Sequence, residues 1–239
     1  MDGFSVSQEP PPAFKEVKWL ADTFVAGMGI GWLVNYCLMV RHSGKGEPNC
    51  MALIPLCWNV SWEIMYTIIY PSGNKVELTV LSMGLAANVF VMAAAVRSTR
   101  IEWRHSPLVA DNAGIIYLVV TLVCLAGHVA LAMEIGHGRA YSWSAVVCQL
   151  TLSVGGLYLL LDRNNTAGGS WMLWLSRFLG SMCTVGFAAV RQMYWPEAYG
   201  WLACPLAYWS FLVFILTDST YGVCYFLVSR AEAKAGKLD

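Results

Sequence analysis

Long apolar stretches alternate with short polar breaks along the chain, and this pattern predicts helices that cross a membrane. A helix rises about 1.5 Å per residue, so roughly 20 apolar residues span the hydrocarbon core of a bilayer. The stretches of this length run over residues 17–40, 51–70, 76–96, 112–135, 142–161, 170–190 and 201–228. Because the connections are short, we expect an all-α membrane protein, a seven-helix transmembrane bundle that occupies residues 1–239 as a single domain.

Lysine and arginine residues are divided unevenly between the two ends of the predicted helices. The side of the N-terminus holds Lys15, Lys18, Lys75, Arg139 and Arg191, and the other side holds Arg41, Lys45, Arg97, Arg100, Arg104, Arg163, Arg230, Lys234 and Lys237. Cytoplasmic ends carry the excess of positive charge, so we expect a cytoplasmic C-terminus and a lumenal N-terminus. We expect an integral, multi-pass protein of the endoplasmic reticulum, without glycan at the acceptor sequence that begins at Asn164.

Composition supports the membrane assignment and excludes several partners. Hydrophobic residues make up 57% of the chain and charged residues 13%, and the net charge is zero, so nothing favours a nucleic-acid partner. Most of the eight cysteines fall within apolar spans without a CxxC motif, which indicates core positions and no metal site. Neither DDxxD nor DxDD occurs, and we expect no cofactor. Glycines such as Gly27, Gly29 and Gly31 suit close helix packing.

Two acidic residues, Glu63 and Asp218, lie deep within predicted spans, far from any lysine along their own helices. A lone acid at the middle of a membrane costs about 2.5–3.5 kcal/mol on insertion scales, so such residues usually have a function. Their intermediate depths suggest one shared site. Arg177, in the sixth span, is placed to pair with Asp218 or to cap a helix end, whereas His128 is expected to be a packing residue.

Aromatic and polar residues accompany both acids. On a helix, Asn59, Trp62, Glu63 and Tyr66 share one face at spacings of three and four residues. Trp209 and Tyr221 lie on either side of Asp218 in the last span. Aromatic faces attract cations, so these positions are candidates for substrate contacts around a carbocation. The candidate substrate-binding residues are Asn59, Trp62, Tyr66, Arg177, Trp209 and Tyr221.

Other classes of seven-helix protein fit the sequence less well. A retinal protein needs a lysine inside a late helix, and every lysine here lies outside or at the edge of the spans. The Asp-Arg-Tyr and Asn-Pro-x-x-Tyr motifs of G-protein-coupled receptors are both missing. A small proton-coupled transporter stays open as an alternative, because intramembrane carboxyl groups also couple proton movement to transport.

Several segments resemble the fungal integral-membrane terpene cyclases of meroterpenoid and indole-diterpene biosynthesis. They are CWNVSWEIMYTIIYPS around Glu63, AGHVALA around His128, WLSRFLGS around Arg177, the pair Trp195 and Pro196, and the single Asp218 of the last span. The resemblance covers nearly the whole chain, including its length and its seven spans. The acidic pair of that family, a glutamate in the second helix and an aspartate in the seventh, corresponds to Glu63 and Asp218 as catalytic residues.

The resemblance implies a metal-free, class II-like cyclisation of the isomerase or lyase type, started by protonation of a terminal epoxide. The implied partners are membrane lipid and a prenylated epoxide, with no obligate protein partner evident. A farnesylated, polyketide-derived substrate is the first expectation, and an indole diterpene is the alternative. A carboxyl group in apolar surroundings can stay neutral and donate a proton. Glu63 is the expected acid with Asp218 assisting, although the reverse assignment, or a pair that shares one proton, stays open.

Overall fold

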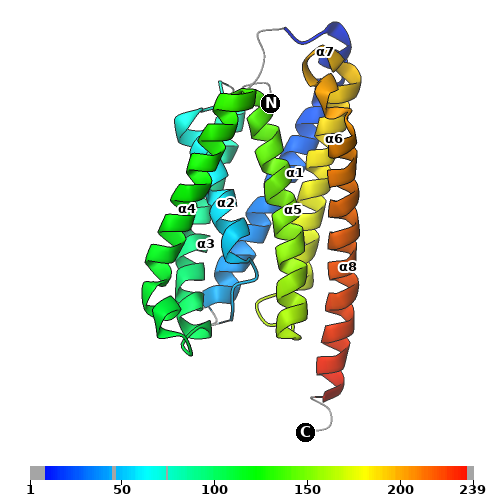
Figure 1. Cartoon of the computed structure of the whole chain (residues 1–239). Helices are drawn as coiled ribbons and strands as arrows, with labels where there is room; N and C mark the ends of the chain where they lie inside the picture. The colour runs from blue at the N-terminus through cyan, green and yellow to red at the C-terminus, as the bar shows by residue number, and fades with distance from the viewer. Residues whose placement is uncertain (1–8, 45–46, 74, 236–239) are drawn as a thin grey trace.

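The computed structural model describes residues 9–44, 47–73 and 75–235. Lys45 and Lys237, which contribute to the charge count, lie outside the described residues. Every regular element in the described part is a helix (Figure 1), which confirms the all-α prediction. The elements are α1 (Pro12–Gly44), α2 (Leu53–Ile64), the π-helical turn η1 (Met65–Ile69), α3 (Lys75–Glu102), α4 (Pro107–Ile135), α5 (His137–Arg163), α6 (Trp171–Tyr194), α7 (Pro196–Tyr199), the 3₁₀ turn η2 (Gly200–Leu202) and α8 (Pro205–Ala235).

Six helices among the described residues, α1, α3, α4, α5, α6 and α8, are long and apolar enough to cross a membrane. The second predicted span corresponds to α2 and η1, which together form a shorter apolar helix over Leu53–Ile69. Many α2 side chains are buried, including Leu56, Cys57 and Val60. This shorter segment packs within the bundle, against α3, α4 and α5.

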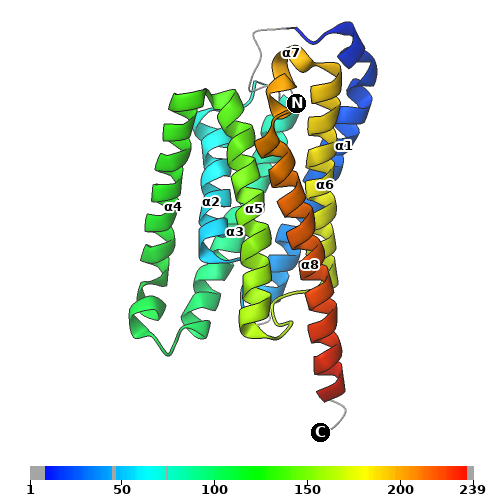
Figure 2. The same ribbon diagram turned by 45° about the vertical axis from the view of Figure 1, so that its right-hand side comes forward.

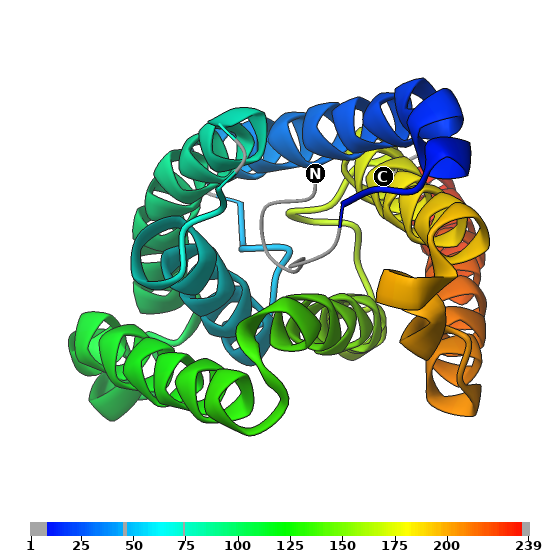
Figure 3. The ribbon, with the colours of Figure 1, turned by 90° about the horizontal axis from the view of Figure 1, so that it is seen from above.

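The long helices stand side by side (Figures 1 and 2), and most of them form a ring. Seen from above in Figure 3, α1 forms one side, α6 and α8 the next, α5 the third, and α2 with α3 the fourth. The helix α4 lies outside this ring, against α2, α3 and α5. α1 packs along α6, and α5 packs along α8. The ring therefore brings residues far apart in sequence to one interior.

Proline and serine residues set several helix starts. Pro205 begins α8 because proline lacks the backbone N–H that a helix interior needs but fits the first turn. The predicted seventh span began at residue 201, and the structure instead places Gly200–Leu202 in the short turn η2. At the start of α6, the Ser170 side chain accepts a hydrogen bond from the backbone N–H of Leu173 at 3.2 Å, as a helix cap does.

α1 and α6 approach each other closely at two glycines. A Cβ atom on Gly31 would lie 2.8 Å from the Cα of Gly180, closer than such atoms can come. Small residues allow helix backbones to meet in a membrane, where no hydrophobic force drives helices together. The expected role of Gly31 in close packing is thus confirmed.

Candidate active site

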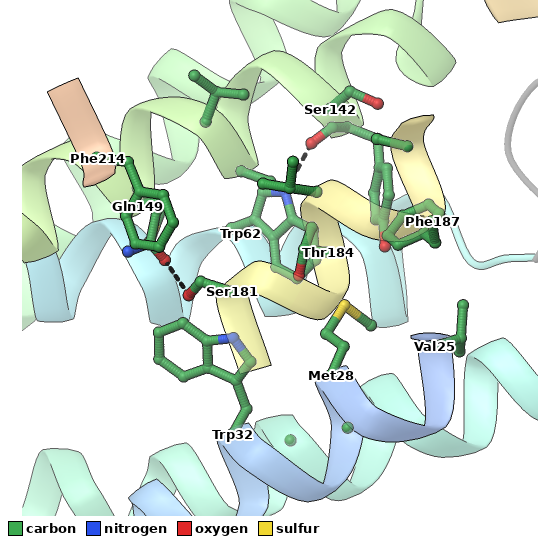
Figure 4. A pocket seen from close by; sticks show the side chains of 18 of the residues that line it. Val25, Met28, Trp32, Trp62, Ser142, Gln149, Ser181, Thr184, Phe187 and Phe214 are labelled. Carbon is green, nitrogen blue, oxygen red and sulfur yellow. Dashed lines mark hydrogen bonds between the residues drawn. The ribbon is translucent and has the colours of Figure 1, made fainter. Parts of the chain in front are cut away.

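A cavity of about 640 Å³ lies inside the ring of helices. Side chains from α1, α2, α3, α5, α6 and α8 line it, and most of them are apolar. Figure 4 shows Met28 and Trp32 of α1, Trp62 of α2 and Phe187 of α6 around this space. The volume suits a small organic molecule, and a mostly apolar wall with a few placed polar groups is typical of a ligand site.

Glu63 supplies a carboxyl group to the cavity wall from α2, with 5% of its surface exposed. The Tyr36 hydroxyl of α1 donates a hydrogen bond to its Oε1 atom at 3.1 Å. The Asn59 amide donates to the Tyr36 oxygen at 2.8 Å, and the Cys148 thiol of α5 donates to Asn59 Oδ1 at 3.4 Å. This chain of hydrogen bonds ends at Glu63 Oε1, which accepts from Tyr36. The other oxygen, Oε2, has no formed hydrogen bond within the described residues.

Residues of α3 also lie against the Glu63 carboxyl. A Cβ atom on Gly84 would lie 3.0 Å from Glu63 Oε1, so this glycine makes room for the acid. Asn88, one turn farther along α3, is fully buried and lies close enough to interact with Glu63 and Tyr36. Neither of its amide atoms meets the geometry of a formed hydrogen bond in the described part of the chain. Glu63 thus sits where side chains of four helices converge.

Tyr66 departs from the face that the helical spacing predicted. The π-helical turn η1 begins at Met65, and its wider i to i+5 winding rotates the residues that follow Glu63. Tyr66 is fully buried, and its ring packs 5.5 Å from Trp62 and edge-on to Tyr141 at 5.0 Å. It therefore supports the cavity wall behind Trp62 and is not among the lining residues.

Asp218, on α8, is completely buried and is surrounded by its own set of polar groups. Arg177 forms a salt bridge with Asp218 Oδ1, which confirms the expected pairing, and the Ser153 hydroxyl donates to Oδ2. The Trp174 ring N–H donates to the Asp218 backbone carbonyl at 3.0 Å. Both side-chain oxygens accept hydrogen bonds, as those of a carboxylate do. Asp218 does not line the cavity, whereas Phe214, one turn earlier, does.

A hydrogen-bond network on α5 links Asp218 to the cavity wall. Gln149 donates to Ser153 Oγ at 3.0 Å and accepts from the Ser181 hydroxyl at 2.7 Å. Gln149 and Ser181 both line the cavity, and Figure 4 shows them bonded to each other. The neighbouring residue, Cys148, belongs to the chain of donors that reaches Glu63. The two acids therefore have different partners, and adjacent residues of α5 connect their surroundings.

The remaining predicted substrate contacts divide into two groups. Asn59 and Trp62 line the cavity, and Trp62 is fixed by a hydrogen bond from its ring N–H to the Tyr141 carbonyl at 3.1 Å. Arg177 and Tyr221 lie beyond the cavity wall, with the guanidinium 5.5 Å from the centre of the Tyr221 ring. Trp209 is 55% exposed and is not among the lining residues.

His128 is fully buried, and both of its ring nitrogens have partners. One lies 3.0 Å from the Ser144 hydroxyl and the other 3.2 Å from the Trp58 carbonyl. This arrangement confirms the expected packing role. Over residues 9–44, 47–73 and 75–235, His, Cys, Asp and Glu side chains form no group of three that could hold a metal ion.

Tyr36, Gln149 and Arg191 line the cavity but were not among the predicted site residues. A tyrosine in an apolar span is common and gives no signal by itself. Gln149 carried a weak signal, because an amide followed four residues later by Ser153 places two polar groups on one face of a membrane helix. Arg191 was counted only as a loop charge near a span end.

Six long apolar helices in the described residues define an integral, multi-pass membrane protein, and a mostly apolar cavity with a buried carboxyl group in its wall lies among them. A profile of Pyr4-like transmembrane terpene cyclases matches residues 4–231. The chain therefore belongs to the Pyr4-like transmembrane terpene cyclase family, in agreement with the resemblance found in the sequence.

Curated relatives match over nearly their full length. The chain is 65% identical over 237 residues to terpene cyclase idtB of Claviceps paspali, with 99% of each chain covered. It is 60% identical to terpene cyclase terB of Tolypocladium album, with 99% of this chain and 98% of the relative covered. It is 53% identical to terpene cyclase paxB of Penicillium paxilli, with 99% and 97% covered. No solved structure gives a significant match.

Proposed function

We propose that this protein cyclises a prenyl chain by protonating its terminal epoxide, with Glu63 as the acid. One observation carries the proposal. The Glu63 carboxyl lies in the wall of a mostly apolar cavity, with Oε1 held by Tyr36 and Oε2 without a formed hydrogen bond in the described residues. Apolar surroundings disfavour an unpaired charge, so Glu63 serves as a neutral acid whose proton is on Oε2.

The reaction follows from this geometry. The proton passes from Glu63 Oε2 to the epoxide oxygen while the bond from that oxygen to the tertiary carbon breaks. The electron-deficient carbon is attacked by the nearest double bond, and ring closure continues along the folded chain. Loss of a proton from carbon ends the cascade, so substrate and product have the same composition and Glu63 regains a proton. The Tyr36 hydrogen bond becomes stronger as Glu63 gains negative charge.

The cavity wall supports a cationic reaction. The rings of Trp62, Tyr141 and Phe187 line it, and aromatic faces stabilise positive charge by about 0.5–2 kcal/mol each. A predominantly apolar lining limits the water that would capture the cation. Ile30, Met83 and Tyr208 line the cavity, and 66%, 51% and 61% of their surfaces are exposed. This exposure suits an apolar substrate that arrives from the bilayer.

We assign Asp218 a supporting role as the ionised partner of Arg177. Ser153 bonds to Asp218 and accepts a hydrogen bond from Gln149, which reaches the cavity. Asp218 thereby holds Gln149 in one orientation in the cavity wall. Among the other predicted contacts, Asn59 and Trp62 act in the cavity. Tyr66, Arg177, Trp209 and Tyr221 are proposed to act only through packing around it.

We infer that the whole chain is one catalytic domain that crosses the membrane seven times. The shorter helix Leu53–Ile69 rises about 25 Å, close to the roughly 30 Å thickness of the hydrocarbon core. The excess of lysine and arginine at one end favours a lumenal N-terminus and a cytoplasmic C-terminus, and the proposed location is the endoplasmic reticulum.

The proposed substrate is a terminal epoxide on a prenyl chain that carries an aromatic or polyketide-derived head group. A farnesylated, polyketide-derived epoxide is the first candidate, and a prenylated indole of diterpene length is the alternative within the same chemistry. Each substrate is polar at both ends and apolar between them. Membrane lipid is the other proposed partner.

An assay with purified protein tests this function. The protein in detergent, with excess chelator, is given each class of epoxide, and the products are analysed by mass spectrometry and NMR. A cyclic product with the same mass as the substrate supports the proposal. If neither epoxide is cyclised, while protein in vesicles moves protons together with a small molecule, the transporter alternative replaces it.

A further inference from the structure

We propose that the end of the cavity around Arg191 binds the head group of the substrate, so that the prenyl chain extends from there to the epoxide at Glu63. The inference rests on the proposed function and adds an orientation and a head-group site to it. It also specifies the chemical class that this site accepts, a planar head group without net charge.

The cavity has polar groups at two ends. The positions of lining residues along α5 give the distance between these ends. At one end, Cys148 belongs to the donor chain of Glu63, and Gln149 bonds to Ser181. At the other end, Tyr141 is close enough to Arg191 for the two side chains to interact electrostatically. Tyr141 and Gln149 are about 12 Å apart along the helix axis, at a rise of about 1.5 Å per residue.

Apolar side chains occupy the wall between these ends. Figure 4 shows Ser142 and Phe187 toward one end of the cavity and Gln149 and Ser181 toward the other. Ala145, between Tyr141 and Gln149 on α5, and Val185, between Ser181 and Phe187 on α6, line this section. An apolar section between two polar ends matches a substrate with an epoxide at one end, a hydrocarbon chain in the middle and a polar head group at the other.

The arrangement around Arg191 indicates what kind of head group fits. Its side chain is buried, lines the cavity, and lies 4.9 Å from the centre of the Tyr199 ring and 5.0 Å from that of Phe187. A guanidinium group stacks on planar π systems and donates hydrogen bonds to oxygen acceptors. Gln192 adds an amide to the same end of the lining. These groups favour a planar head group with π faces or carbonyl and hydroxyl oxygens.

A nearby acid indicates that the head group is neutral. Glu77 is 1% exposed and accepts a hydrogen bond from Ser72 at 2.6 Å. Like Arg191, it is close enough to Tyr141 to interact with it electrostatically. Arg191 and Glu77 thus both lie near Tyr141 at this end, and an ionised head group there would add a charge without its own partner in a buried place.

Two substrates and one variant test the site. The full epoxide and the same prenyl epoxide without its head group are given to wild-type protein and to Arg191→Gln. We expect KM for the full substrate to rise about tenfold or more, as loss of a charged hydrogen-bond donor does. The rate with the truncated epoxide should stay within about twofold of the wild-type rate. Arg139→Gln, at an exposed arginine near the same end of the bundle, should change neither.

The outcomes separate this inference from the proposed function. An equal loss on both substrates in a folded variant, or no change on either, overturns the head-group site while wild-type cyclisation still stands. If wild-type protein cyclises neither substrate, the proposed function itself fails. A photoreactive group on the head group gives a second measurement that needs no variant. Crosslinks within residues 187–202 support the inference, and crosslinks within residues 148–153 contradict it.

Discussion

At the scale of single residues, the environment of Glu63 is built by side chains from other helices. Tyr36 comes from α1, Cys148 from α5 and Gly84 from α3. The donors orient one carboxyl oxygen, and the glycine leaves space behind it. An acid at mid-membrane depth is costly, and this setting holds it in one orientation in the cavity wall.

Replacing Tyr36 with phenylalanine removes the hydroxyl that donates to Glu63 Oε1 and accepts from the Asn59 amide. A hydrogen bond to a charged group contributes about 1.5–3 kcal/mol, so the loss of this bond in the transition state should lower kcat about 10- to 100-fold. KM should stay within about twofold, because the ground state keeps its other contacts. Steady-state kinetics measure both, with Tyr158→Phe, at a 62% exposed tyrosine, as the control. An unchanged kcat would show that the Tyr36 hydroxyl does not assist the reaction.

Sequence reasoning identified the residues whose presence in a membrane helix is costly and missed those that are ordinary there. Glu63, Asp218 and the Arg177 pairing were visible because charges interrupt apolar spans. Tyr36 was not visible, because its role depends on how α1 packs against α2. Which groups meet across the bundle depends on tertiary packing.

At the scale of elements, the α3 backbone at Gly84 limits the space available to the Glu63 carboxyl. Gly84→Ala would place a methyl group 3.0 Å from Oε1 and push the acid from its position. Misplacement of a catalytic group by about 1 Å can reduce the rate roughly a hundredfold, so turnover should fall at least about tenfold.

The matched control for this change is Gly114→Ala on α4, where an added Cβ meets no atom within 4 Å. It should leave turnover unchanged. Thermal unfolding in detergent and product formation are measured for both variants. Equal turnover in the two variants would mean that Glu63 tolerates displacement, contrary to the proposed geometry.

The ion pair between α6 and α8 has a separate, stabilising role. Arg177→Met or Asp218→Asn alone leaves a buried group without its partner, which typically costs about 3–5 kcal/mol when a charge stays unpaired. The double variant should regain part of the lost thermal stability, yet not the activity, because Ser153 and Gln149 lose the anion that orders them. A double-mutant cycle of unfolding temperatures tests this. Additive losses would show that the pair is not coupled.

The apolar pattern predicted which residues form the helices but not which face of each helix points into the bundle. α4 and α8 are apolar nearly all round, so their inward faces could not be identified from the sequence. This explains why Trp209 was chosen as a substrate contact, although the structure exposes it, and Phe214 was not. The π-helical turn after Glu63, which rotates Tyr66, has no comparable signal in the sequence.

At the scale of the whole molecule, the proposed orientation places residues 163–170 in the cytoplasm. Asn164 begins a glycosylation sequence there and ends α5 with a left-handed backbone conformation. We expect no glycan at Asn164 in cells and a cytoplasmic reporter at the C-terminus, since positive charge gathers at this end. Glycosidase treatment and a C-terminal reporter check the two points. A glycan on Asn164 would show that this end of the protein lies in the lumen, which is the opposite of the proposed topology.

The central claim is that Glu63 gives the proton that opens the epoxide. The most direct test is the rate of cyclic product formation by Glu63→Gln, compared with wild type and with Glu134→Gln, which changes an exposed glutamate. Loss of a general acid typically costs about 10²–10⁴ in rate. The account predicts that Glu63→Gln folds with an unchanged unfolding temperature, turns over at least about a hundred times more slowly, and that Glu134→Gln behaves like wild type. Wild-type turnover by Glu63→Gln would contradict it.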